Sequence, residues 1–322
     1  MKKQFSITKF HDNYSIRRYL RTQFPHLSQD TIHKSLRNGD IRVNNMKVGM
    51  DCVLYKDDIV AIWEMLLIEN ESNEIDCVSK PHEYAFLKPL LLDKREDLWC
   101  FNKPSGLAMQ GGTGLKTNMN YLVSGMMHAE NVAYKPHIVH RLDKGTSGCC
   151  LFATNSMYAS ALTKLFAIRA IKKHYIAICQ YMSSEKDILS NRNYGIIDHN
   201  IDGQEAITEY KLEYTFTIDT INNEQNKQVE LALISFFPKT GRKHQIRKHA
   251  ASLNWPILGD DIYNISDETT MYPSMCLHAK AISYNPINQT KDNIAMINTN
   301  VNIEAFHYNA EMPIHMTRLL PK

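Results

Sequence analysis

A single carboxylate stands among cations in the segment Val139–Gly148, which reads VHRLDKGTSG. Asp143 is the only acid there, and Arg141 and Lys144 lie close to it, before a run rich in Gly and Ser. A carboxylate that pairs with an arginine stays ionised and fixed in orientation, which is the state that chemistry at this group would need. Aspartate before Lys–Gly is also a common turn former, so the segment alone leaves both interpretations open.

A second segment, Lys239–His249, supplies surplus positive charge. It reads KTGRKHQIRKH and contains five cations and two histidines without an acid, on what the pattern predicts to be a loop leading into a helix. A solvated basic face would look the same. Because one segment has an isolated carboxylate and the other has free guanidinium groups, the two together allow an Asp–Arg pair.

Neither metal nor nucleotide chemistry is favoured. Histidines occur at 137 and 140, at 244 and 249, and alone at 278, without an HExxH spacing or another set of three or four ligands. The glycine-rich stretch Asn102–Thr117 lacks the phosphate-loop spacing GxxxxGK[ST], and no GxGxxG occurs. We therefore expect no metal and no cofactor, and a tight loop at 102–117 whose backbone approaches a neighbour closely.

The elements that position these segments must come from a chain of 322 residues, which is ordinary for two domains. Hydrophobic residues make up 43% and charged residues 22%, which excludes disordered and collagen-like proteins. No apolar stretch approaches the ~20 residues that span a bilayer, and no apolar region follows the first lysines. Seven cysteines without a CxxC pair suggest reduced thiols. We expect a cytoplasmic protein without a membrane partner.

Charge is distributed unevenly along the chain, although the net charge is only +3. Residues 1–50 carry ten Lys or Arg against three Asp or Glu, whereas residues 51–100 carry five against twelve. A basic module followed by an acidic stretch is typical of a polyanion-binding unit joined by a solvated linker to a larger domain. A chance fluctuation of charge on solvated faces is the alternative.

The basic module has the pattern of two short helices and a hairpin. Ser15 is placed to cap an amphipathic helix that ends before Pro25, and a second helix begins at Ser28 and ends at Asn38–Gly39. Residues 40–48 alternate in polarity around Asn44–Asn45, which predicts a hairpin. The cations on these elements, enough for several phosphate contacts, are Arg17, Arg18, Arg21, Lys34, Arg37, Arg42 and Lys47.

This pattern, carried by SIRRYLRTQFPHLSQDTIHKSLRNGDIRVNN, resembles the small S-four-like RNA-binding module of a ribosomal small-subunit protein. We assign residues 1–66 to it, the irregular acidic residues 67–95 to a linker, and residues 96–322 to a second domain. In that domain strand-like alternation at 175–181 and 228–237 mixes with a helix-like run over 156–171, capped by Asn155 or Ser156. The mixture predicts an α+β fold.

From about residue 96 the chain resembles the RluA-type family of pseudouridine synthases. The motifs that carry the resemblance are VHRLDKGTSG, KKHY at 172–175, GQEAITEYK at 203–211, TGRKHQIRKH at 240–249, LHA at 277–279 and the opening loop FNKPSGLAMQGGTG. The GGTG form of that loop and the N-terminal module point to the RluC-like branch, which acts on large-subunit (23S) ribosomal RNA. The resemblance implies a mixed, largely antiparallel sheet flanked by helices.

The resemblance also implies roles for individual residues. Asp143 matches the catalytic aspartate, which attacks the target uridine so that the base detaches, rotates and rejoins through C5. Tyr175 matches the residue that stacks on the flipped base and moves a proton, and Arg247 matches the partner that pairs with the aspartate. Arg141 matches the residue that fills the space left by the flipped nucleotide, and we add Arg242 and His244 to the RNA-binding set. No metal or cofactor is implied.

These expectations describe an isomerase that acts on large-subunit ribosomal RNA, free or in an assembling large subunit, and that works as a monomer. Two alternatives remain at this point. The same chemistry on transfer RNA would use the same pocket motifs, and a non-catalytic RNA-binding protein of ribosome assembly would keep the fold without turnover. The intact Asp143, Tyr175 and Arg247 favour the enzyme.

Overall fold

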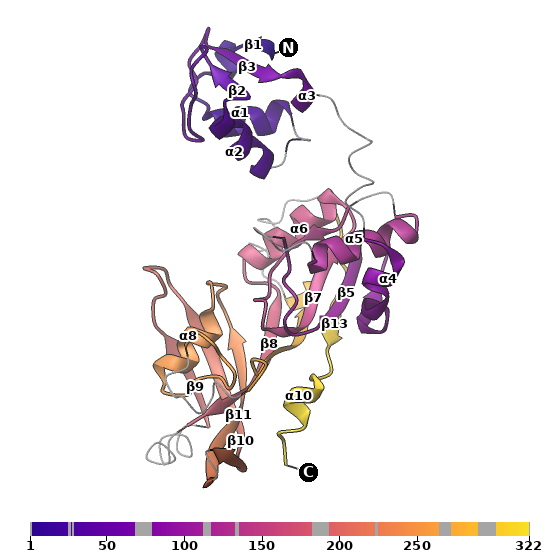
Figure 1. The fold of residues 1–322 in the computed structure, drawn as a ribbon, viewed down its shortest axis with the longest axis vertical. Helices are drawn as coiled ribbons and strands as arrows, with labels where there is room; N and C mark the ends of the chain where they lie inside the picture. The colour runs from indigo at the N-terminus through magenta and orange to yellow at the C-terminus, as the bar shows by residue number, and fades with distance from the viewer. Residues whose placement is uncertain are drawn as a thin grey trace. The chain divides into compact units, whose positions relative to one another are not determined.

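The computed structural model describes residues 2–24, 27, 29–67, 79–111, 117–132, 135–181, 193–222, 225–263, 272–288 and 301–321. The chain divides into two compact units, Met1–Cys77 and Val78–Lys322, and each is described by itself (Figure 1). The predicted helix start at Ser28, the stop at Pro25, residues 112–116 of the glycine-rich loop and residues 68–78 of the predicted linker lie outside the described residues.

The first unit packs two helices against a three-stranded antiparallel sheet of order β1-β3-β2. Its elements are β1 (Lys2–Ser6), η1 (Lys9–His11), α1 (Ile16–Gln23), α2 (Gln29–Asn38), β2 (Ile41–Val43), β3 (Ile59–Trp63) and α3 (Glu64–Leu67). The Ser15 hydroxyl accepts a hydrogen bond from the backbone N–H of Arg18 and caps α1 as the sequence predicts. Ile16, Leu20, Ile32 and Leu36 turn inward and form a core with the sheet.

The predicted hairpin over 40–48 is wrong in its second strand. Asn44 and Asn45 both have positive φ and form the expected turn, but only one bridge, between Val43 and Met46, follows it. β2 pairs instead with β3, whose Val60 and Ile62 are fully buried, because this later segment supplies the apolar residues that the core needs.

The second unit is built on a ten-stranded mixed sheet (Figure 1). The path runs β4-β5-β7-β12-β8-β11-β10-β9, with β6 beside β7 and β13 beside β12. Only β7 and β12 pair in parallel among the described strands. The strands are β4 (Leu91–Lys94), β5 (Leu98–Lys103), β6 (His137–Ile138), β7 (Ser147–Ala153), β8 (Lys172–Gln180), β9 (Tyr194–Asp198), β10 (Ile207–Asn222), β11 (Gln225–Pro238), β12 (Leu277–Tyr284) and β13 (Phe306–Asn309).

Helices cover both faces of this sheet. They are α4 (Pro81–Tyr84), η4 (Ala85–Leu90), α5 (Met119–Ala129), α6 (Ser156–Ala167), α8 (Gln245–Ser252), η7 (Pro286–Asn288) and α10 (Ile314–Thr317). On the β5–β7 half, α6 packs on one face and α5 with α4 on the other. On the β8–β11 half, α8 covers one face and residues around α10 the other. Alternate residues of a strand point to opposite faces, so a strand covered on both faces is rich in apolar residues, and all seven residues of β7 are buried. This confirms the α+β fold.

Two boundaries differ from those that the sequence predicts. The residues 79–95, assigned to the linker, include α4, η4 and β4 and belong to the second unit. Helix α6, with Asn155 as its cap, ends at Ala167 rather than at Ile171. Arg169 takes a left-handed conformation there, and the N–H of Ala170 returns to the carbonyl of Leu165, which closes the helix and frees 172 to begin β8. None of the described helices is long and apolar enough to span a membrane.

Candidate active site

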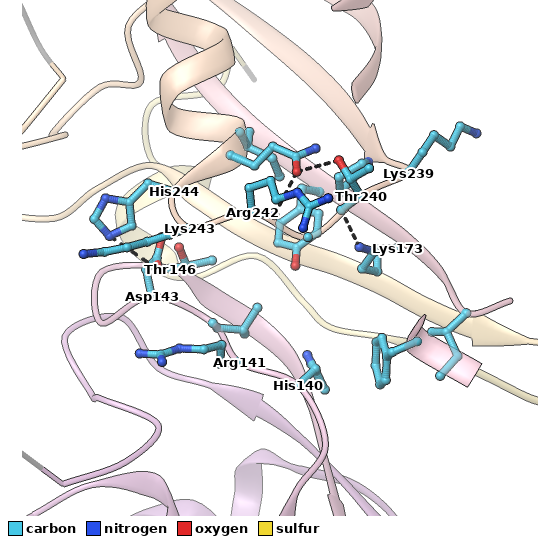
Figure 2. Close-up of a pocket in the computed structure, with 18 of the residues that line it drawn as sticks. His140, Arg141, Asp143, Thr146, Lys173, Lys239, Thr240, Arg242, Lys243 and His244 are labelled. Atoms are coloured by element: carbon cyan, nitrogen blue, oxygen red, sulfur yellow. Dashed lines mark hydrogen bonds and ion pairs between the residues drawn. The ribbon is translucent and has the colours of Figure 1, made fainter. Parts of the chain in front are cut away.

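Asp143 lies on the loop 139–146 between β6 and β7, and Figure 2 shows it between Arg141 and Thr146 of the same loop. The N–H of Thr146 bonds the carbonyl of Asp143 at 3.1 Å, which gives the loop a turn. The carboxylate is 26% exposed and therefore accessible from the pocket that it lines. The structure therefore confirms that Asp143 forms a turn, and the exposed carboxylate leaves the chemical interpretation open.

The opening loop of the domain holds the Asp143 loop from one side. Lys103 is fully buried and its ammonium donates to the carbonyls of Pro104, Leu107 and Lys144. The hydroxyl of Ser105 donates to the carbonyl of Gly145 at 2.7 Å. Burial lowers the pKa of Lys103 to about 8. These bonds fix the backbone immediately after Asp143 to β5.

The strand β12 holds the other end of the same loop. Ser147 and His278 share a hydrogen bond of 2.9 Å, and the second ring nitrogen of His278 lies 3.2 Å from the carbonyl oxygen of Ala310. A Cβ at Gly148 would meet the carbonyl oxygen of Ala279 at 2.2 Å, so only glycine permits this close approach of β7 to β12. The LHA motif on β12 therefore fixes Ser147 and Gly148, the residues that directly follow the Asp143 loop.

His140 has a structural role in the same loop. Its Nε2 accepts a hydrogen bond from the N–H of Leu151 at 2.9 Å, and its ring stacks on Phe166. Burial lowers the pKa of His140 to about 3, which keeps the ring neutral. His249 is similarly occupied, by Thr208 and the carbonyl of His199. In the described part of the chain no group of three or more His, Cys, Asp or Glu side chains is arranged to hold a metal ion.

Tyr175 projects from β8 into the same pocket as Asp143. Burial raises the pKa of its phenol, and the negative charge of Asp143 acts in the same direction. The phenol is therefore neutral at physiological pH and keeps its proton. A half-buried ring of this kind offers a stacking surface, and its O–H can donate a proton.

The basic segment forms the opposite wall. Gln245, the first residue of α8, braces it by accepting from the Thr240 hydroxyl at 2.7 Å and from the Arg242 N–H at 2.9 Å. His244 precedes α8 in a left-handed conformation, and its Nε2 lies 3.7 Å from a carboxylate oxygen of Asp143. Figure 2 shows these two side chains facing each other. Burial lowers the pKa of His244, although the Asp143 carboxylate acts in the opposite direction.

The predicted ion pair between Arg247 and Asp143 is absent from the described contacts of these two residues. Arg247 instead donates to both carboxylate oxygens of Asp260, at 2.7 and 2.6 Å, and also reaches Asp261 at 3.1 Å. Burial alone would raise the pKa of Asp260, but hydrogen bonds from Arg247 and from two backbone N–H groups outweigh it and the pKa is lowered. The guanidinium of Arg247 therefore pairs with the fully buried carboxylate of Asp260 and not with that of Asp143.

The pocket between these walls has a volume of about 780 Å³. Its lining includes seven Lys or Arg side chains and a single acid, Asp143. These cations are Arg141, Arg169, Lys173, Lys239, Arg242, Lys243 and Arg247. A cavity with this balance favours a polyanion that presents one reactive group to one carboxylate.

The structure brings together one group of the predicted site residues and leaves the other in the first unit. Asp143, Tyr175, Arg247, Arg141, Arg242 and His244 all line the pocket. Six of the seven N-terminal cations lie on α1, α2 and β2, and the seventh, Lys47, follows β2. Arg42 is half-buried and braces the β2 turn through the carbonyls of Gly39 and Asn45, whereas the others, Arg17, Arg18, Arg21, Lys34 and Arg37, are exposed.

The sequence analysis assigned no role to four residues that shape the site: Lys103, Lys173, Asp260 and His278. Asp260 could not be identified as the partner of Arg247 from spacing, because 13 residues and a loop separate them. A signal existed for Lys103, a lysine at the end of the largely apolar strand β5. Such a residue needs a specific partner when it is buried.

Comparisons with known proteins agree with this geometry. The family of RNA pseudouridylate synthases matches residues 97–252. The ribosomal large subunit pseudouridine synthase C of Rickettsia typhi is 31% identical over 283 residues, which cover 84% of this chain and 88% of that protein. The protein of the same name from Rickettsia prowazekii is 32% identical over 289 residues, with the same coverage.

A solved structure supports the fold. Human RNA pseudouridylate synthase domain containing 4 superposes with a TM-score of 0.53 at 21% sequence identity, covering 73% of this chain and 94% of the human one. The matched region 97–252 contains Asp143, Tyr175 and Arg247. The chain therefore belongs to the RNA pseudouridylate synthase family, isomerases that convert uridine to pseudouridine in RNA.

Proposed function

We propose that this enzyme isomerises specific uridines in large-subunit (23S) ribosomal RNA, with Asp143 as the nucleophile. The observation that carries the proposal is the position of Asp143, a single carboxylate on a rigid loop in a cavity lined by seven cations. The names of the relatives, which act on the ribosomal large subunit, support the choice of RNA.

The chemistry assigned to each residue follows from what it can offer. The carboxylate of Asp143 forms a transient covalent bond with the target nucleotide while the N-glycosidic bond breaks. Tyr175 holds the detached uracil by stacking. When C5 of the base bonds to the sugar, the bond to Asp143 breaks, and the neutral phenol acts as a proton relay: it donates its own proton to N1 of the uracil and takes up the proton that leaves C5. Arg247 positions the start of α8, and with it His244 opposite Asp143.

The target base must leave the RNA stack to reach this pocket. Extrusion costs a few kcal/mol, which contacts between the cations and phosphates offset. Arg141 lies on the same loop as Asp143 and is exposed, so it is placed to fill the vacated position in the RNA (Figure 2). Arg242 and His244 hold the substrate from the opposite wall.

We further propose that residues 1–66 form an S-four-like RNA-binding domain. Its five exposed cations on α1 and α2 support this role, since phosphates are contacted by Lys and Arg that are free of intramolecular acids. Within the described residues, none of Arg17, Arg21, Lys34 and Arg37 forms an ion pair. Arg18 is oriented by Tyr14, with its guanidinium 3.9 Å above the ring. The proposed enzyme is a cytoplasmic monomer that works on the rRNA, free or in an assembling large subunit, without a cofactor.

Pseudouridine mapping tests the function directly. Ribosomal RNA is compared between cells with and without the gene, re-supplied with the wild type, Asp143→Asn or the control Asp202→Asn, which changes an exposed carboxylate outside the pocket. Signals lost in the knockout should return with the wild type and the control alone. An unchanged rRNA map would refute the rRNA substrate, and mapping of transfer RNA in the same cells would show whether that RNA is modified instead.

A further inference from the structure

Lys173 is a pocket cation that the mechanism above leaves without a role. Three other cations of the lining are neutralised by carboxylates: Arg169 by Glu205, Lys239 by Glu209 and Arg247 by Asp260. The ammonium of Lys173 donates to the backbone carbonyl of Thr240 at 2.9 Å, and no carboxylate of the described residues lies within ion-pair distance of it (Figure 2). An ammonium has three N–H donors, so two remain for another acceptor.

The positive charge of Lys173 is not neutralised by a carboxylate among the described residues. Burial lowers the pKa of Lys173 to about 8, and the nearby Arg169 acts in the same direction. The side chain is therefore mainly charged near pH 7, but its charge is held away from water among other cations. A bound anion would relieve this cost, since a buried charge is stabilised chiefly by a hydrogen-bonded counter-charge.

The position of Lys173 along β8 indicates which anion this is. Lys173 and Tyr175 are two residues apart in one strand, so their side chains leave the same face about 6.6 Å from each other. Both line the pocket. A uridine stacked on Tyr175, with its sugar toward Asp143, places its own backbone within reach of the next side chain of that face. That side chain is Lys173.

The neighbouring lysine provides an internal contrast. Lys172 points to the opposite face of β8, is exposed, and lines a separate cavity with Ser283 and Tyr284 rather than the pocket of Asp143. Two lysines adjacent in sequence, with the same charge, thus occupy different environments. Only one of them can contact a nucleotide held at Asp143.

We propose that Lys173 binds a phosphate that flanks the flipped uridine, and so fixes the nucleotide's backbone while its base detaches and rotates. The inference rests on the proposed function, because it needs a nucleotide seated on Tyr175. It makes Lys173 a substrate-binding residue as well as a brace of the loop at Thr240. The contact between Lys173 and the phosphate keeps the sugar opposite Asp143 after the glycosidic bond between sugar and base has broken.

The test uses the full-length chain with Asp143→Asn, which is expected to bind RNA without turnover, and a short RNA hairpin containing a mapped target uridine. The hairpin carries a methylphosphonate, which removes one negative charge, on either the 5′ or the 3′ side of that uridine. One of the two substitutions should weaken binding about tenfold or more, the value of a lost charge-assisted hydrogen bond. Adding Lys173→Met should remove this sensitivity, whereas Lys172→Met should keep it.

Two outcomes would overturn the proposal. One is a hairpin that binds equally well with and without each methylphosphonate, a result that needs no lysine variant and so does not depend on its folding. The other is an equal response of the Lys173→Met and Lys172→Met proteins. If the wild type forms no pseudouridine in rRNA, the proposed function itself fails. If it does so while Lys173→Met and Lys172→Met respond alike, only the phosphate contact fails.

Discussion

Arg247 and Asp260 form a bidentate ion pair in which the carboxylate is completely buried. The pair joins α8 to the loop that follows it, and α8 begins immediately after His244, which faces Asp143. The arginine that the sequence assigns to Asp143 therefore pairs with a second carboxylate, and its influence on Asp143 passes through the position of α8 and through a charge interaction at longer range.

Substitution of Arg247 by alanine should destabilise the protein as well as reduce its activity. Removal of one partner leaves a buried carboxylate uncompensated, which costs about 3–5 kcal/mol. The double variant Arg247→Met with Asp260→Asn should recover much of this free energy of unfolding, since no orphan charge remains. Denaturant titration measures the stability, and pseudouridine formation measures the activity.

The double variant also separates structure from catalysis. If it regains stability but remains inactive, the guanidinium contributes to the reaction beyond its pairing with Asp260. Full activity in the double variant would mean that Arg247 serves only to hold α8. Equal stability of the wild type and Arg247→Ala would contradict the buried pair.

Two variants of Tyr175 should separate the contribution of its ring from that of its hydroxyl. Tyr175→Phe keeps the stacking surface and loses the O–H, whose raised pKa makes it a proton donor rather than a base at neutral pH. Turnover should fall by about 10²–10⁴-fold, the usual contribution of proton transfer, with RNA affinity unchanged. Tyr175→Ala should weaken RNA binding in addition. Single-turnover kinetics and RNA titrations distinguish the two, and full activity in Tyr175→Phe would exclude proton transfer by the phenol.

Protonation of His278 should limit stability in acid. Burial lowers the pKa of His278 to about 4, below its ordinary value of 6.5, so the unfolded chain binds a proton that the folded protein does not. This contribution to stability is complete above pH 6.5 and is lost as the pH falls toward 4. Between pH 7 and pH 5 it amounts to about 2 kcal/mol.

The variant His278→Asn isolates that contribution. Its free energy of unfolding should vary less between pH 7 and pH 5 than that of the wild type, by about the same 2 kcal/mol. His307→Asn, an exposed position on β13, is the matched control and should keep the wild-type pH dependence. An identical dependence in His278→Asn would show that His278 does not titrate in this way.

Charge on α1 and α2 should govern the salt dependence of RNA binding. The triple variant Arg17→Gln, Arg21→Gln and Arg37→Gln removes three exposed cations. The slope of log K against log salt should become shallower by about 2–3 units, since each of the three phosphate contacts contributes roughly 0.7–0.9. Turnover at saturating RNA should not change, because these residues lie in the first unit.

The matched control removes the same charge elsewhere in that unit. Lys3, Lys9 and Lys56 are exposed lysines outside α1 and α2. Their replacement by glutamine should leave the slope nearly unchanged. Equal slopes for the two triple variants would mean that net charge, not the helical face, determines the affinity.

Local features of this protein could be predicted from residue types and spacing alone. Short stretches of residue types indicate the motif around Asp143, the cap of helix α6, the mixture of strand-like and helix-like patterns, and the basic first fifty residues. Helix caps, strand periodicity and charge depend on near neighbours, and so they can be read without the fold. The resemblance to the pseudouridine synthases was carried by such short motifs, and the comparisons confirm the family.

The pairing of residues that are distant in sequence became visible only in the folded protein. The return partner of β2 is β3, more than ten residues beyond the predicted hairpin, and Arg247 binds Asp260 instead of Asp143. Lys172 and Lys173 look alike in sequence but face different cavities. These choices depend on which buried group lacks a partner once the core is packed, and burial is a property of the whole fold rather than of any segment.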